Sequence, residues 1–92
     1  MILEIVTPEQ VVYSGSVESL SVPGINGQFQ MLDNHAPVVS LLVKGAVKIF
    51  GKVEIDETVA SLFAKGEGGT TDFLITGGVI EMKDNKAIVL AD

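Results

Sequence analysis

Residues 22–45 read VPGINGQFQMLDNHAPVVSLLVKG, and this stretch decides the fold. The dipeptides Pro23-Gly24 and Asn26-Gly27 indicate tight turns, because proline presets φ and glycine accepts a positive φ. A polar loop follows at Asp33–Pro37, and its closing proline forces the residue before it into an extended conformation. The apolar run Val38–Val43 comes next. The stretch therefore predicts a sheet corner made of a strand, a tight turn, a short strand, a broad loop and a buried strand.

The composition predicts one small β domain over residues 1–92. A chain of this length buries only about 60–65% of its unfolded surface, so its core is thin. Apolar residues make up 47% of the sequence and aromatic residues only 5%, with no tryptophan. The core must therefore come from Val, Ile and Leu, of which the β-branched Val and Ile favour strands. The absence of cysteine excludes disulfides and thiolate metal sites.

The charge balance argues against two classes of partner. The net charge is −6, and all six basic residues are lysines. Without arginine the chain lacks the bidentate fork that grips phosphate or guanine. An acidic surface also repels nucleic acid and anionic lipid. No apolar run approaches the ~18 residues of a membrane-spanning segment. We therefore expect no nucleic-acid partner and no direct insertion into a membrane.

Strand-like segments recur at regular short spacing along the chain. In Val17–Val22 we expect Leu20 and Val22 to face inward and Ser19 and Ser21 to face outward. Lys86–Ala91 is apolar on both faces, which indicates a strand that is central or covered on both sides. The pattern predicts an all-β fold, an antiparallel β-sandwich or flattened barrel of about 8–10 short strands. The other segments are Met1–Val6, Val11–Tyr13, Val38–Val43, Ala46–Phe50, Phe73–Thr76 and Val79–Met82.

Residues 51–70 allow two interpretations. Val59, Leu62 and Phe63 recur at helical spacing, and Asp56 is suited to cap a helix that begins after it. We favour this interpretation, one short amphipathic helix within residues 55–65. The alternative is a strand, supported by an alternating apolar set: Val53, Ile55, Val59 and Phe63.

The sequence carries no pattern typical of an enzyme. His35 is the only histidine, and a triad with Asp33 and Ser40 would lack the G-x-S-x-G elbow. We expect His35 to order its loop by bonding to the backbone. The acidic group Glu54, Asp56 and Glu57 is better explained as a solvated face than as a metal site. We predict no catalytic residue, no metal site and no cofactor.

The stretch Gln28–His35 is the best candidate for a binding surface. It mixes apolar side chains with polar ones, and an apolar centre with a polar rim suits a protein–protein contact. Phe29 and Leu32 could equally plug the end of the sandwich, and we expect both to be at least partly buried. The interpretation is therefore a rigid binding module.

Three separate pieces of the sequence resemble one known family. The first is Val22-Pro23-Gly24 with Gly27, Phe29, Leu32, His35-Ala36-Pro37 and Gly45. The second is Ile5–Glu9, and the third runs from Gly77-Gly78 through Glu81 and Asn85 to Val89–Asp92. Together they resemble the N-terminal β-sandwich domain of the epsilon subunit of F-type ATP synthases. The resemblance covers most of the chain and leaves a gap at about residues 51–70.

The resemblance implies a non-catalytic rotor subunit of the central stalk. Such a subunit binds the gamma subunit, rests on the polar loops of the c-ring and couples proton translocation to ATP synthesis. It is peripheral, on the cytoplasmic face of the bacterial inner membrane or another energy-transducing membrane. The family commonly has an acid at the position of Gln28, so a hydrogen bond would here replace a salt bridge to the c-ring. The positions that match the family's c-ring-facing loop are Gln28, Phe29, Met31, Leu32, Asp33, Asn34 and His35.

Two departures from the family carry further expectations. Members usually continue into a helical hairpin that can inhibit ATP hydrolysis, and this chain ends at Asp92. A short form without that hairpin is expected to lack helix-borne inhibition. Residues 51–70 are longer than usual and must protrude or pack on one side. The competing hypothesis is a small ligand- or carrier-type β-sandwich binding module, which would call for exposed aromatic residues or a modifiable lysine at a hairpin tip.

Overall fold

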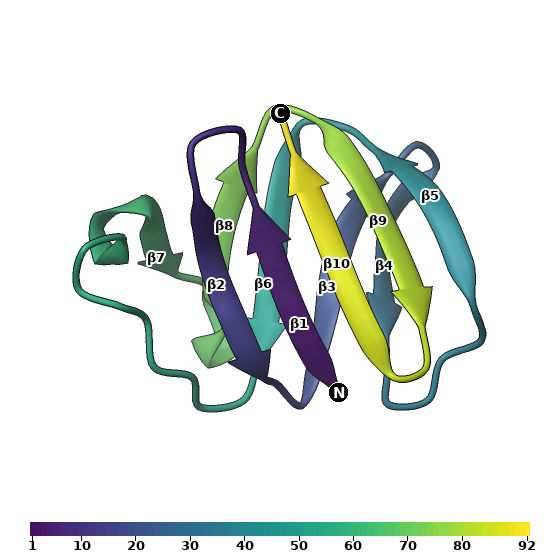
Figure 1. Cartoon of the computed structure of the whole chain (residues 1–92), viewed down its shortest axis with the longest axis horizontal. Coiled ribbons are helices and arrows are strands. Elements are labelled where there is room, and N and C mark those ends of the chain that lie inside the picture. Colours follow the sequence, from purple (N-terminus) through teal and green to yellow (C-terminus); the bar gives the residue numbers. More distant parts are fainter.

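Ten strands and two short 3-10 turns form the computed structural model, which describes all 92 residues (Figure 1). The predicted all-β class is confirmed. The turns are η1 (Ala60–Leu62) and η2 (Glu67–Gly69). The strands are β1 (Ile2–Val6), β2 (Val11–Ser16), β3 (Ser19–Gly24), β4 (Gly27–Met31), β5 (Val38–Leu42), β6 (Gly45–Phe50), β7 (Phe63–Lys65), β8 (Thr71–Ile75), β9 (Gly78–Lys83) and β10 (Lys86–Ala91).

The strands form one continuous sheet in the order β2-β1-β10-β9-β5-β3-β6-β8-β7, and β4, which is outside this order, pairs with β3. The sheet curls into two layers, so that β2, β1 and β10 lie in front of β8, β6 and β3 (Figure 1). Every pairing is antiparallel except that of β1 with β10, which run parallel. The predicted antiparallel sandwich is confirmed apart from this pair, which joins the two ends of the sequence.

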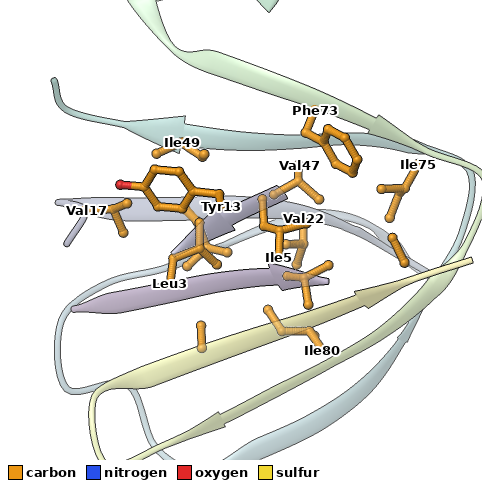
Figure 2. Close-up of a cluster of buried hydrophobic side chains, with 14 of the residues drawn as sticks. Leu3, Ile5, Tyr13, Val17, Val22, Val47, Ile49, Phe73, Ile75 and Ile80 are labelled. Atoms are coloured by element: carbon orange, nitrogen blue, oxygen red, sulfur yellow. The ribbon is translucent and has the colours of Figure 1, made fainter. Parts of the chain in front are cut away.

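The core lies between the two layers, where alternate side chains of facing strands meet (Figure 2). Leu3 and Ile5 of β1 point towards Val47 and Ile49 of β6, and all four are fully buried. Burying a side chain of this kind contributes about 1.5–3 kcal/mol. The expectation that aliphatic residues supply the core is confirmed, with Tyr13 and Phe73 as its only buried aromatic residues.

Two strands are less covered than the apolar pattern indicated. Strand β5 is not the buried strand that was predicted, because Leu41 is 60% exposed and only Leu42 is buried. Strand β10 is central, between β1 and β9, so the first of its two predicted alternatives is confirmed; the second does not hold, since Leu90 is 52% exposed. An apolar run in the sequence indicates only that a segment is hydrophobic. It does not distinguish a side chain inside the core from one on an uncovered face.

Both faces of β3 are covered. Leu20 and Val22 are fully buried, as predicted, but Ser19 and Ser21 are also buried, contrary to the prediction. The reason is that longer side chains on the neighbouring strands cover these small serines, since Gln30 of β4 and Lys48 of β6 both lie opposite Ser21. The Gln30 amide of β4 reaches across and donates to the Ser19 hydroxyl at 3.1 Å.

The amphipathic helix predicted within residues 55–65 is wrong. Only the single 3-10 turn η1 forms there, and it leads into the strand β7. Asp56 does not cap a helix; its Oδ1 accepts from the backbone N–H and the hydroxyl of Thr58 at 2.9 and 2.6 Å, closing a local turn. Phe63 pairs with Phe73 of β8 at a ring-centroid separation of 5.2 Å. The alternating set of the strand interpretation describes the packing better, because tertiary contacts override helical spacing over so short a segment.

A largely buried polar network lies where β6 and β8 pair, next to the segment that follows β7. The Lys48 ammonium lies 2.9 Å from Asp72 Oδ2, and the Thr70 hydroxyl donates to Asp72 Oδ1 at 2.7 Å. Gly66 lies directly over this network and donates its N–H to the Thr70 carbonyl. A Cβ at position 66 would stand 2.3 Å from Asp72 Oδ2, so glycine is required there for close approach.

Candidate partner-binding surfaces

The seven residues predicted to form one binding loop do not form one surface. Gln28, Phe29 and Met31 belong to strand β4, and the loop proper begins at Leu32. The strand runs from the β3–β4 hairpin at one end of the sandwich to the loop before β5 at the other (Figure 1). At about 3.3 Å per residue, Gln28 lies about 10 Å from Met31 and farther still from His35. The sequence pattern did not separate a short strand from an extended loop.

The apolar members of that set differ in accessibility. Met31 is fully buried and offers a partner no surface, while Phe29 is half-buried, as predicted. Leu32 is 61% exposed, so the expectation that it anchors the loop in the core is wrong. Alternation along β4 explains the first two, because it directs Met31 into the core and leaves its neighbours nearer the surface.

The polar loop after β4 is ordered by hydrogen bonds. The backbone N–H of Asn34 donates to the Asn85 side chain at 2.8 Å, which ties the loop to the β9–β10 turn. The exposed His35 places Nδ1 2.7 Å from the Ala36 carbonyl, a backbone contact of the kind expected for it. Asp33 accepts from the amino group of Met1. The exposed members of the set at this end are Leu32, Asp33, Asn34 and His35.

Gln28 has a structural role that sequence reasoning missed. Its Nε2 donates to the Ala46 carbonyl at 2.8 Å. Carried onward, the register of β3 and β6 would set Pro23 opposite Ala46. Proline has no N–H to donate. The Pro23 carbonyl points towards β6, since it accepts from the Val43 N–H. The N–H that proline lacks would have pointed in the same direction, towards the Ala46 carbonyl. The glutamine amide supplies it, and its Oε1 has no hydrogen-bond partner.

The β3–β4 hairpin and the β5–β6 turn form what we call the hairpin end. Ile25 at the hairpin tip is 66% exposed, and Val43 and Lys44 of the turn are also exposed. The Val43 N–H···O=C Pro23 bond of 2.9 Å holds the two turns together. The hairpin end therefore presents one exposed surface made of Ile25, Asn26, Gln28, Val43 and Lys44.

A second surface, which we call the sheet face, lies on the outer side of the front layer. Val6, Leu90, Val79 and Leu41 are direct cross-strand neighbours on β1, β10, β9 and β5, so their side chains form one row. Val39 and Ile88 extend the apolar surface beside Glu81. A contiguous apolar row with charged residues at its margin is typical of the centre of a protein interface. The sequence signal for it was the run 38–43, which was misread as core.

Two pKa values are shifted, and neither marks a catalytic centre. Partial burial raises the pKa of the Tyr13 phenol, whose hydroxyl donates to the Ser16 carbonyl. The two hydrogen bonds from Thr58 lower the pKa of the Asp56 carboxyl. No three carboxylate or imidazole side chains converge as metal ligands would. None of the helical segments is long and apolar enough to cross a membrane.

Comparison with known proteins identifies the family. The sequence model of the ATP synthase delta/epsilon chain β-sandwich domain matches residues 1–92. ATP synthase epsilon chains of Chlorobaculum tepidum and Chlorobium limicola are 36% and 38% identical over 90 residues, covering 98% of this chain and 86% of each relative. The epsilon chain of Pelotomaculum thermopropionicum is 38% identical over the same length, but this chain covers only 56% of it.

Solved structures show the same fold. A chain from the Tetrahymena thermophila mitochondrial ATP synthase central stalk and c-ring superposes with a TM-score of 0.71 at 20% identity, over 99% of this chain and 62% of that one. A chain from the Euglena gracilis mitochondrial ATP synthase gives a TM-score of 0.73 at 17% identity, over 99% and 49%. From the full-length match of the family model and the identity to named epsilon chains, we conclude that this chain belongs to the delta/epsilon family of ATP synthase subunits.

Proposed function

We propose that this chain is a central-stalk rotor subunit of an F-type ATP synthase. It binds the gamma subunit and the polar loops of the c-ring, and it couples proton translocation to ATP synthesis without catalysing a reaction. Membership of the family supports this assignment, and the uncovered apolar row of the sheet face carries it. A ligand- or carrier-type binding module is not favoured, because the similar sequences are ATP synthase epsilon chains.

The sheet face suits a folded protein such as the gamma subunit. Its central row is apolar and contiguous, and Leu41 stands out from it at 60% exposure. A partner that covers such a row removes apolar area from water, and this contributes a free energy of about 25 cal/mol per Å² to a stable contact. The exposed loop at Leu32–His35 leads directly into β5, so the same partner would reach it.

The hairpin end suits the polar loops of the c-ring. Of the residues first predicted for that contact, Gln28 alone belongs to this end, where Asn26 and Lys44 add further polar groups. The free Oε1 of Gln28 can accept one hydrogen bond from the ring, and a neutral contact of this kind depends little on salt. The subunit would then be peripheral, on the cytoplasmic face of the bacterial inner membrane or another energy-transducing membrane.

The test is reconstitution with a stalk complex stripped of its epsilon subunit. The wild-type chain should bind the gamma subunit and restore coupling between proton flow and ATP synthesis. Leu41→Glu puts a charge in the middle of the sheet face and should weaken gamma binding at least tenfold. Leu74→Glu is the matched control, because Leu74 is 73% exposed on β8 in the other layer. The assignment would be refuted if the wild-type chain failed to restore coupling. It would also be refuted if Leu41→Glu and Leu74→Glu weakened gamma binding equally.

A further inference from the structure

One edge of the sheet is left without a partner strand. Strand β2 (Val11–Ser16) pairs with β1 only. On its other side lies the irregular segment 53–59, in which Val59 is buried in the core and the partly buried Val53 and Ile55 pack against it. No backbone hydrogen bond joins this segment to β2. The outward-pointing N–H and C=O groups of β2 therefore have no protein partner along this edge.

A groove follows the open edge. It has a volume of about 300 Å³, at the lower limit for a ligand site. One wall is the edge of β2, where Val11 is exposed, and the other is the segment that begins at Glu54. The β2 strand contains no lysine or proline, which are residues that usually protect an edge from pairing. The lining residues are Gln10–Ser14, Glu54, Asp56, Thr58 and Val59.

The groove is negatively charged. Glu54 and Asp56 line one wall, no lysine lines either wall, and neither carboxylate forms a salt bridge. The hydrogen bonds from Thr58 to Asp56 Oδ1 favour the ionised carboxylate. A second copy of this chain, with net charge −6, would bring the same acids to the contact. Charge therefore favours a basic occupant over self-pairing.

We propose that this groove binds an extended segment of a partner protein that carries a basic side chain. The segment adds as a further strand to β2 through backbone hydrogen bonds, and its lysine or arginine lies between Glu54 and Asp56. Strand addition of this kind takes affinity from the main chain and specificity from alternate side chains. The site is separate from the hairpin end and the Val6–Leu41 row, so it goes beyond the rotor contacts proposed above.

The probe is the heptapeptide acetyl-Lys-Thr-Val-Lys-Val-Thr-Lys-amide, titrated into the isotope-labelled whole chain and followed by NMR. We expect shifts in β2 and residues 54–59, and slower hydrogen exchange at alternate β2 amides. A peptide with glutamate at the three lysine positions should bind at least threefold more weakly. The absence of shifts at millimolar peptide, protection at another strand, equal binding of the acidic peptide, or dimerisation through β2 would each overturn the proposal.

A pair of charge variants tests the acidic wall. The double variant E54Q/D56N should weaken the lysine peptide by about twofold to thirtyfold, because it removes two exposed ion pairs that contribute about 0.2–1 kcal/mol each. The D56N amide oxygen still accepts from Thr58, so the local turn is kept. The control is E18Q/E67Q, which has the same net charge and lies outside both the groove and the sheet face. Equal affinity in both double variants would show that Glu54 and Asp56 do not hold the basic side chain.

Discussion

Removing the Gln28 amide should destabilise the sandwich by a measurable amount. The bond from Nε2 to the Ala46 carbonyl is 2.8 Å long and replaces the donor that Pro23 lacks. A neutral hydrogen bond contributes about 0.5–1.5 kcal/mol net. For a domain of this size, about 1 kcal/mol lowers Tm by roughly 4–8 °C. Gln28→Ala should therefore lower Tm by several degrees, and Gln28→Glu by at least as much, because a carboxylate cannot donate.

A double-mutant cycle isolates the cause. Pro23→Ala restores a backbone N–H, so Gln28→Ala should cost about 0.5 kcal/mol less in that background than in the wild type. Gln30→Ala is the matched control. Gln30 lies on the same strand and donates to Ser19 instead, so its cost should not depend on residue 23. Urea unfolding of the six chains of the two cycles, and of Gln28→Glu as a seventh, measures all terms. An additive cycle, or a Gln28→Glu chain with an unchanged midpoint, would refute the substitution of one donor for the other.

Three further effects follow from the described contacts. Gly66→Ala should cost about 1–3 kcal/mol in urea melts, because its Cβ would stand 2.3 Å from Asp72 Oδ2; unchanged stability would mean that the network moves aside. Leu20→Ala should cost about 2.7–5 kcal/mol, because Leu20 is fully buried, and Leu74→Ala less than about 0.5 kcal/mol; equal costs would contradict the assigned packing. The lowered pKa of Asp56 gives a contribution to stability that is complete above the ordinary value of about 3.9 and is lost as pH falls through the lowered folded-state value. NMR titration should find that lower value, and a midpoint at or above 3.9 would contradict it.

Most strands could be predicted because their alternation is local. In β1, Leu3 and Ile5 face the core and Glu4 does not, a pattern that five residues are enough to show. The parallel pairing of β1 with β10 could not be predicted, since no hairpin joins them and nothing local specifies the partner. The helix expected near Val59 failed for a related reason. The conformation of residues 53–63 is set by the core surface on which their apolar side chains pack, and the helical spacing of those side chains in the sequence has little influence.

The candidate surfaces were harder to predict than the fold. The motif around Gln28 indicated the family correctly, but it joined residues that β4 carries to opposite ends of the sandwich. The exposure of Leu41 depends on the absence of a covering layer, which a sequence does not report. Gln28 itself could have been suspected of a structural role. A proline within a strand leaves an acceptor without its donor, and such backbone groups are paired by side chains or water where the backbone does not pair them.

The parallel pairing of β1 with β10 has a consequence for how this protein folds. The first of the ten strands gains its inner neighbour only when the tenth is in place, since β10 lies between β1 and β9. Contacts between distant parts of a chain slow folding, because the loop must close before they form. During synthesis on the ribosome, the edges of β1 and β9 that pair with β10 would remain without a partner until β10 emerges. Folding should therefore be a late, concerted event. Release of the chain before β10 is made would expose two unpaired strand edges that are prone to aggregation.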